Sequence, residues 1–168
     1  MPNSNQQQPP SQPPELSIRP ARLGDEHALF GMIRQLARYE RLETAVTGSA
    51  EALGEHLFGE RPVIEALLAI EHERALGYAL FFTTYSTFLT KPGLYLEDLF
   101  VLEEERGRGI GRALLTELRR VASARGAGRL EWTVLDWNQK AIAFYEHFGA
   151  RVVPDWRLCR IEVPELPR

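Results

Sequence analysis

Two adjacent acids, Glu97 and Asp98, stand in an otherwise apolar run that leads into a glycine-rich turn. A carboxylate beside a substrate ammonium group stabilises the cation and can accept its proton through a water molecule. Successive residues of a strand point to opposite faces, so only one of the two acids enters a cleft unless the strand is distorted. The alternative is a structural role, in which one acid pairs with an arginine.

The turn at residues 106–112 reads Arg-Gly-Arg-Gly-Ile-Gly-Arg and opens a predicted helix. Free N–H groups at a helix start, next to glycines that allow close approach, favour a bound phosphate. A P-loop is excluded because Arg112, instead of a lysine, follows the last glycine. A dinucleotide fingerprint would need a glycine at position 112, although Asp136 could mimic its ribose-binding acid, so a nucleotide-dependent oxidoreductase stays as an alternative.

The composition is that of a soluble domain with a sizeable core, since 44% of the 168 residues are apolar and 26% are charged. A net charge of −3 gives no reason to expect nucleic acid as a partner. Cys159 is the only cysteine, which excludes an internal disulfide and fits a cytoplasmic location. The sequence shows no signal peptide, no apolar run that would span a membrane and no histidine spacing typical of a metal site.

Periodicity predicts an α/β fold with one mixed sheet and helices on both faces. Residues 1–14 are rich in Gln and Pro and are predicted to be a disordered tail, and residues 15–168 to be a single domain. Strands are expected at residues 16–20, 63–70, 76–85, 94–102, 130–135, 150–153 and 156–163, and helices at 25–40, 49–58, 110–125 and 138–147. The buried stripe of the third helix is predicted to be Ile110, Leu114, Leu115, Leu118, Val121 and Ala122.

The pattern Arg106-x-x-Gly109-x-Gly111 resembles the pyrophosphate-binding turn of the GNAT family of acetyl-CoA-dependent N-acetyltransferases. The resemblance runs from Ile18 to about Val163 and is closest to the diamine (spermidine/spermine) and thialysine branch. It rests on several separated motifs in the same order, at residues 18–21, 36–40, 95–98, 134–139 and 144–145, with Val-Leu-Asp-Trp-Asn-Gln especially similar to thialysine N-ε-acetyltransferases. It implies the GNAT fold, with antiparallel N-terminal strands, a splayed parallel pair and a β-bulge near the two acids.

The resemblance also implies roles for individual residues. Acetyl-CoA would be the cosubstrate, the amine would attack it directly in a ternary complex, and the chain would form a homodimer. Glu97 would relay the proton of the amine, and Tyr145 would be the general acid for the leaving thiolate. The cofactor-binding residues would be Leu99, Phe100, Val101, Arg106, Gly107, Arg108, Gly109, Ile110, Gly111, Arg112, Asn138, Lys140, Ala141 and Tyr145. The substrate-binding residues would be Tyr39, Glu40, Glu97, Asp98, Glu131, Trp132 and Trp156.

The acceptor is the least determined part of this prediction. Spermidine/spermine enzymes carry an acid and a tryptophan where this chain has Ser86 and Phe88, and residues 153–156 are also shorter and less acidic than their counterpart. A long polycation needs several carboxylates spaced along its groove, so a small acceptor such as thialysine or a related amino acid is expected rather than a polyamine. A non-catalytic acetyl-CoA-binding module and a protein lysine acetyltransferase are the alternatives.

Overall fold

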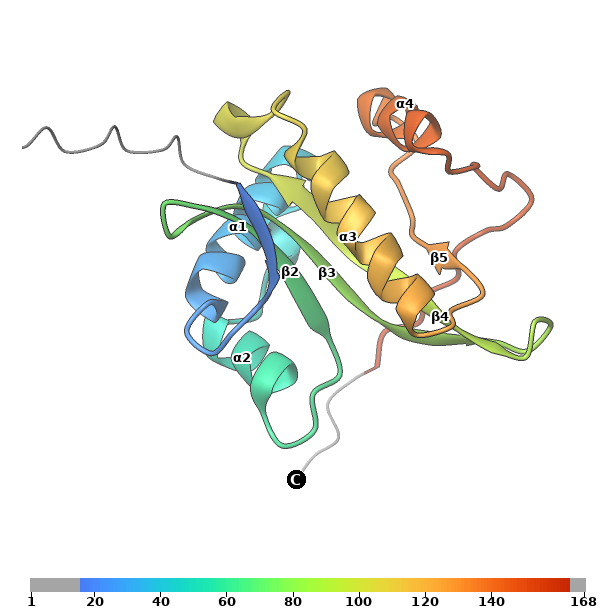
Figure 1. The fold of residues 1–168 in the computed structure, drawn as a ribbon, viewed down its shortest axis with the longest axis horizontal. Coiled ribbons are helices and arrows are strands. Elements are labelled where there is room, and N and C mark those ends of the chain that lie inside the picture. The colour runs from blue at the N-terminus through green and yellow to red at the C-terminus, as the bar shows by residue number, and fades with distance from the viewer. Residues whose placement is uncertain (1–15, 164–168) are drawn as a thin grey trace, which may run out of the picture. The chain divides into compact units, whose positions relative to one another are not determined.

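The computed structural model describes residues 16–163, which form two compact units that divide after Trp132. The predicted tail at residues 1–14 lies outside the described residues. The first unit contains a five-stranded sheet with the strands in chain order, shown in Figure 1. These strands are β1 (Ser17–Pro20), β2 (Glu65–Glu71), β3 (Arg74–Ser86), β4 (Lys91–Val101) and β5 (Leu130–Glu131). The first four are antiparallel and β5 is parallel to β4, which confirms the predicted mixed sheet.

Helices cover both faces of this sheet. One face is covered by α1 (Glu26–Glu40) and α2 (Ala50–Phe58), and the other by α3 (Ile110–Ala124), which crosses the near face in Figure 1. Successive residues of each strand point to opposite faces of the sheet, so alternate residues pack against α1 and α2 or against α3. Leu29, Met32 and Leu57 from the first pair of helices pack against Ala66, Leu68, Tyr78, Leu80 and Phe100. The stripe of α3 is buried at Ile110, Leu114, Leu115, Leu118 and Ala122, while Val121 is half-buried.

Local signals in the sequence account for the helix ends. Ser49 accepts a hydrogen bond from the backbone of Ala52 and starts α2, as predicted. Short 3₁₀ helices, η1 (Glu43–Ala45) and η2 (Glu103–Glu105), follow α1 and β4. In the second unit α4 (Gln139–Phe148) begins at Asn138, whose side chain accepts from the Ala141 backbone, and ends at Gly149 with φ of +100°.

Among residues 16–163, no helix combines the length and apolar character that crossing a membrane requires.

Three strand predictions near the C-terminus are wrong. The strand expected at 130–135 pairs only at Leu130 and Glu131, because β4 becomes irregular just past the partner residues Leu94 and Tyr95. Residues 150–153 and 156–163 have no regular structure, and residues 151–163 are exposed. Their alternating apolar pattern is typical of a strand, but a strand forms only where a neighbouring edge supplies its hydrogen bonds.

Candidate active site

A β-bulge separates the two adjacent acids from the regular part of β4. Leu96 pairs with Phe81, and Asp98 pairs with the preceding residue Leu80, so Glu97 is the extra residue without a partner on β3. Since neighbouring residues of β3 point to opposite faces, the bulge places Leu96 and Asp98 on opposite faces although they are two residues apart. Asp98 therefore lies on the face covered by α1, and the bulge expected from the resemblance is confirmed.

Three carboxylates meet at this bulge. Asp98 is partly buried and accepts a hydrogen bond from the phenol of Tyr78 at 3.2 Å, while Glu97 beside it is exposed. Glu40, in the last turn of α1, is partly buried and close enough to act electrostatically on both Asp98 and Tyr78. The C-terminal end of α1 adds the negative end of its dipole to these acids. This acid cluster, Glu40, Glu97 and Asp98, is suited to hold a cation.

The environment of Asp98 is costly for its charged form. Burial raises the pKa of Asp98 to about 6, and repulsion from Glu97 and Glu40 adds to the rise, while the Tyr78 hydrogen bond opposes it. Burial also raises the pKa of Glu40 above its ordinary value. The pKa of Asp98 is higher in the folded chain than its ordinary value of 3.8. The contribution of Asp98 to folding stability therefore falls as the pH rises from about 4 to about 6 and beyond. A carboxyl group in such an environment is a candidate functional group.

Beyond Tyr95, the edge of β4 on the side of β5 has no partner strand among the described residues. The pairing with β5 covers only Leu94 and Tyr95, and within residues 16–163 no strand pairs with residues 96–101 on that side. This is the splayed pair that the resemblance implies. Because alternate residues of an antiparallel strand direct their polar backbone groups to the same edge, Leu99 and Val101 present theirs on this unpaired edge, while those of Phe100 face β3. An extended amide-containing chain can pair with such an edge.

The glycine turn after η2 has the geometry of an anion site. Gly107 and Gly109 have φ of +81° and +80°, and a Cβ atom at either position would meet nothing within 4 Å. Gly109 is the N-cap of α3, and in the described part of the chain no side chain caps this helix and no acid lies in its first turn. Among the described residues, no capping side chain therefore competes with a ligand for the N–H groups of the first turn, at Ile110, Gly111 and Arg112, which lie at the positive end of the helix dipole. These residues fit a diphosphate group.

Arg106 connects the glycine turn with the last turn of α1, which carries Glu40 of the acid cluster. Its Nε donates to the carbonyl of Val101 at 3.1 Å, and its guanidinium lies 4.8 Å from the ring centroid of Tyr39 and 5.7 Å from that of Phe100. Tyr39 is in the same last turn of α1 as Glu40. The cation–π contacts thus hold the end of α1 beside the end of β4. The predicted contact of Arg106 with the cofactor stays a prediction.

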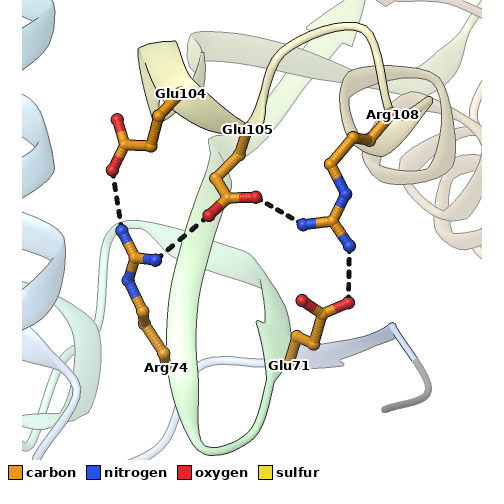
Figure 2. A network of polar contacts seen from close by, with 5 residues as sticks. All are labelled: Glu71, Arg74, Glu104, Glu105 and Arg108. Atoms are coloured by element: carbon orange, nitrogen blue, oxygen red, sulfur yellow. Dashed lines mark hydrogen bonds and ion pairs between the residues drawn. The ribbon is translucent and has the colours of Figure 1, made fainter. Parts of the chain in front are cut away.

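An ion-pair network fixes the other side of the turn (Figure 2). Arg108 binds Glu71 at 2.7 Å and also pairs with Glu105, and Arg74 binds Glu105 at 3.0 Å and Glu104 at 2.7 Å. The network ties the hairpin between β2 and β3 to η2 and the glycine turn. It also neutralises two of the three glutamates that precede the turn, which would otherwise repel a phosphate. The Arg108 side chain faces this network, so its predicted cofactor contact would have to come from its backbone.

Neutralising Glu105 should destabilise the turn. Its side chain is 13% exposed, and its carboxylate pairs with the guanidinium groups of both Arg74 and Arg108. We expect Glu105→Gln to lower the Tm by roughly 2–4 °C in a thermal melt. Glu117→Gln is the matched control, since Glu117 pairs only on the surface of α3 with Arg120. The control should change the Tm by less than about 1 °C. Equal Tm changes in the two variants would show that the network has no special role.

The second unit carries the remaining predicted residues. Tyr145 is half-buried on α4, its ring 5.4 Å from that of Phe144, while Lys140 is exposed at the start of this helix. The Asn138 side chain caps α4 through the backbone of Ala141, which is the structural role expected of it as a cap. Trp156 is 79% exposed. The roles of these residues in cofactor and substrate binding stay predictions.

Glu131 and Trp132 end the first unit. Glu131 is exposed in β5 and its carboxylate binds Arg129 at 2.6 Å, and Trp132 is partly buried. No sequence pattern predicted that Tyr78, Arg74, Glu71 or Glu105 belongs to the site. Apart from the pair of Glu105 with Arg108, three positions on, their contacts join residues 20 to 37 positions apart, and no local pattern shows such pairings.

Comparison with known proteins identifies the family of this chain. The sequence profile of the acetyltransferase (GNAT) family matches residues 32–150. The chain therefore belongs to the GNAT acetyltransferase family, as the sequence motifs predicted. Among solved structures, an integron cassette protein from the mobile metagenome of V. cholerae aligns with a TM-score of 0.72 and 28% identity, covering 88% of this chain and 93% of that one.

Particular relatives lie in the predicted branch. A thialysine N-epsilon-acetyltransferase of Sus scrofa is 38% identical over 86% of this chain and 91% of its own length. L-ornithine N5-acetyltransferase NATA1 of Arabidopsis thaliana is 51% identical over a match that covers 51% of this chain and 37% of that protein.

A more distant solved structure shares the fold alone. The aminoglycoside N-acetyltransferase AAC(6')-Iy in complex with CoA aligns with a TM-score of 0.73 at 18% identity, covering 91% of this chain and 99% of that one.

Proposed function

We propose that the chain transfers an acetyl group from acetyl-CoA to a primary amine of a small molecule by direct attack in a ternary complex. The observation that carries this proposal is the placement of three carboxylates at a bulge of β4, on the strand that leads into the glycine turn. The bulge suits a cation, and the glycine turn that follows the same strand suits an anion. Relatives that acetylate thialysine and ornithine support the same reaction.

Acetyl-CoA supplies the activated acetyl group as a thioester. Its pyrophosphate would be held by the first-turn amides of α3 and by the backbone of Gly107 and Gly109, where the structure leaves open space. The open backbone edge of residues 99–101 would pair with the pantetheine arm. From the second unit, Asn138, Lys140 and Ala141 are the further residues assigned to this cosubstrate.

The acid cluster would bind the amine as its ammonium ion and then remove a proton. Asp98, with a pKa of about 6, is mostly ionised at neutral pH and so can pair with the cation. Glu97, which is exposed, would pass the proton to solvent through a water molecule. Tyr145 would protonate the departing thiolate. Cys159 lies on an exposed segment, and direct attack by the amine requires no cysteine nucleophile.

The acceptor is proposed to be an amino acid with a terminal amine, of the thialysine or ornithine kind, rather than a polyamine. Ser86 is buried and its hydroxyl accepts from the backbone of Leu89, so it closes the β3–β4 turn instead of lining a groove. Phe88 beside it is 93% exposed. Neither position offers the carboxylate that would extend the acid cluster toward a second distant ammonium group. Tyr39, Glu131, Trp132 and Trp156 are the further acceptor residues of the proposal.

An acetyl-CoA-dependent panel of thialysine, ornithine, lysine, spermidine, short diamines and a lysine peptide tests the function. We expect kcat/KM for thialysine or ornithine to exceed that for spermidine by about tenfold or more, because Ser86 and Phe88 supply no carboxylate for a second ammonium group. Preference for the peptide would instead indicate a protein acetyltransferase. Tight CoA binding without turnover of any amine would indicate a non-catalytic module.

We also propose a cytoplasmic homodimer. Residues 152–163 expose Val152, Val153, Trp156, Leu158, Ile161 and Val163, each between 44% and 87% accessible. Such a concentration of exposed apolar side chains supports burial against a second copy. The exposed free thiol of Cys159 fits a reducing compartment.

A further inference from the structure

Tyr78 is the one member of the acid-cluster environment that the proposed reaction has not used. Its side chain is completely buried in the core between the sheet and α1, among Leu29, Leu80 and Phe100. A buried phenol needs a hydrogen-bond partner, and its hydroxyl donates to Asp98 Oδ2 at 3.2 Å. A phenylalanine would fill the same volume, so the hydroxyl is not needed for packing.

We propose that Tyr78 is a positioning residue of the acceptor site, whose buried hydroxyl holds the Asp98 carboxylate in place for the ammonium group of the acceptor. This inference rests on the proposed function. It adds a residue that touches neither the amine nor acetyl-CoA and that acts only through Asp98.

The bulge explains why such a residue is needed. In a regular strand Asp98 would share a face with Leu96 and would point toward α3, away from Glu40. The bulge turns Asp98 toward α1, but a bulged residue has fewer ladder contacts to fix its direction. The hydroxyl of Tyr78 is anchored on the neighbouring strand, since Tyr78 pairs with Phe100 two residues beyond Asp98. It therefore fixes the carboxylate from a rigid element.

The charges around Asp98 give this hydrogen bond a second effect. The groups that face Asp98 are Tyr78 from β3, Glu40 from α1 and Glu97 from β4, and both glutamates oppose its ionisation. The phenol donates to the ionised form and so keeps the pKa of Asp98 lower than burial and repulsion alone would make it. Without the hydroxyl, the pKa of Asp98 should rise further and a larger fraction would be neutral at pH 6–7.

Tyr78→Phe tests the inference through the pH dependence of kcat/KM for the amine. We expect its acidic limb to move to higher pH by roughly half a unit to one unit, with KM for acetyl-CoA unchanged. KM for the amine at pH 6.5 should rise by about 1.5- to 3-fold, in proportion to the lost ionised fraction of Asp98. Tyr85→Phe is the matched control, since Tyr85 lies at the exposed end of the same strand, and its profile should stay as in the wild type. An unshifted acidic limb in Tyr78→Phe would overturn the inference.

A double-mutant cycle separates positioning from a general loss of packing. In an Asp98→Asn background, Tyr78→Phe should have no further effect on KM for the amine, because the proposed action passes through the carboxylate. An undiminished effect in that background would contradict the inference.

Failure of the proposed function can be distinguished from failure of this inference. The carbon-13 carboxyl signal of Asp98 can be titrated by NMR without any substrate. If the wild type acetylates no amine, a higher Asp98 pKa in Tyr78→Phe would still confirm the positioning, and an unchanged one would overturn it.

Discussion

Gly109→Asp should abolish acetyl-CoA binding in a chain that still folds. Gly109 is the N-cap of α3 with φ of +80°, and a side chain there would extend into the open space next to the first-turn amides. An aspartate would fill this space, satisfy an amide with its own carboxylate and place a negative charge where the diphosphate is expected. We expect CoA affinity measured by calorimetry to fall by about 100-fold or more, since both steric and charge effects act against binding.

Gly126→Asp is the matched control for this variant. Gly126 lies at the opposite end of α3, also has a left-handed φ, of +67°, and a Cβ atom added there would likewise meet nothing within 4 Å. The control therefore carries the same added charge and a similar backbone strain. It should bind CoA as the wild type does, and a melt of each variant shows whether the fold survives. Wild-type CoA affinity in folded Gly109→Asp would rule out the glycine turn as the phosphate site.

The sequence was most informative where a feature depends on residues that are close in the chain. The apolar stripe at Ile110, Leu114 and Leu118 predicted α3 almost to the residue, because helix periodicity is a local property. Ser49 and Asn138 were identified as caps for the same reason. The mixed sheet and the glycine turn also follow from local patterns and from the order of the elements.

Features that depend on distant partners were predicted less well. The pattern at residues 156–163 is typical of a strand, yet in the described residues no neighbouring edge pairs with it. The face that Asp98 occupies depends on the bulge at Glu97, and a register shift of one residue reverses every side chain beyond it. The bonds of Tyr78 with Asp98 and of Arg108 with Glu71 exist only once this register is set.

Tyr145→Phe should lower kcat while leaving acetyl-CoA affinity nearly unchanged. The substitution keeps the ring that contacts Phe144 and removes only the hydroxyl proposed to protonate the leaving thiolate. Loss of a general acid typically costs roughly 10²- to 10⁴-fold, but a thiolate is a better leaving group than an alkoxide, so we expect about a 10- to 100-fold loss of turnover. Single-turnover kinetics and CoA calorimetry measure the two quantities separately.

The leaving group itself shows whether the lost hydroxyl acted as an acid. A thioester whose thiol has a lower pKa leaves more easily without protonation, so general-acid catalysis contributes less to its cleavage. The ratio of wild-type to Tyr145→Phe turnover should therefore shrink with such an acetyl donor, provided that the donor keeps the diphosphate for binding. If Tyr145 served only to pack α4, the ratio would be the same for both donors, and unchanged turnover with acetyl-CoA would remove Tyr145 from the acid role altogether.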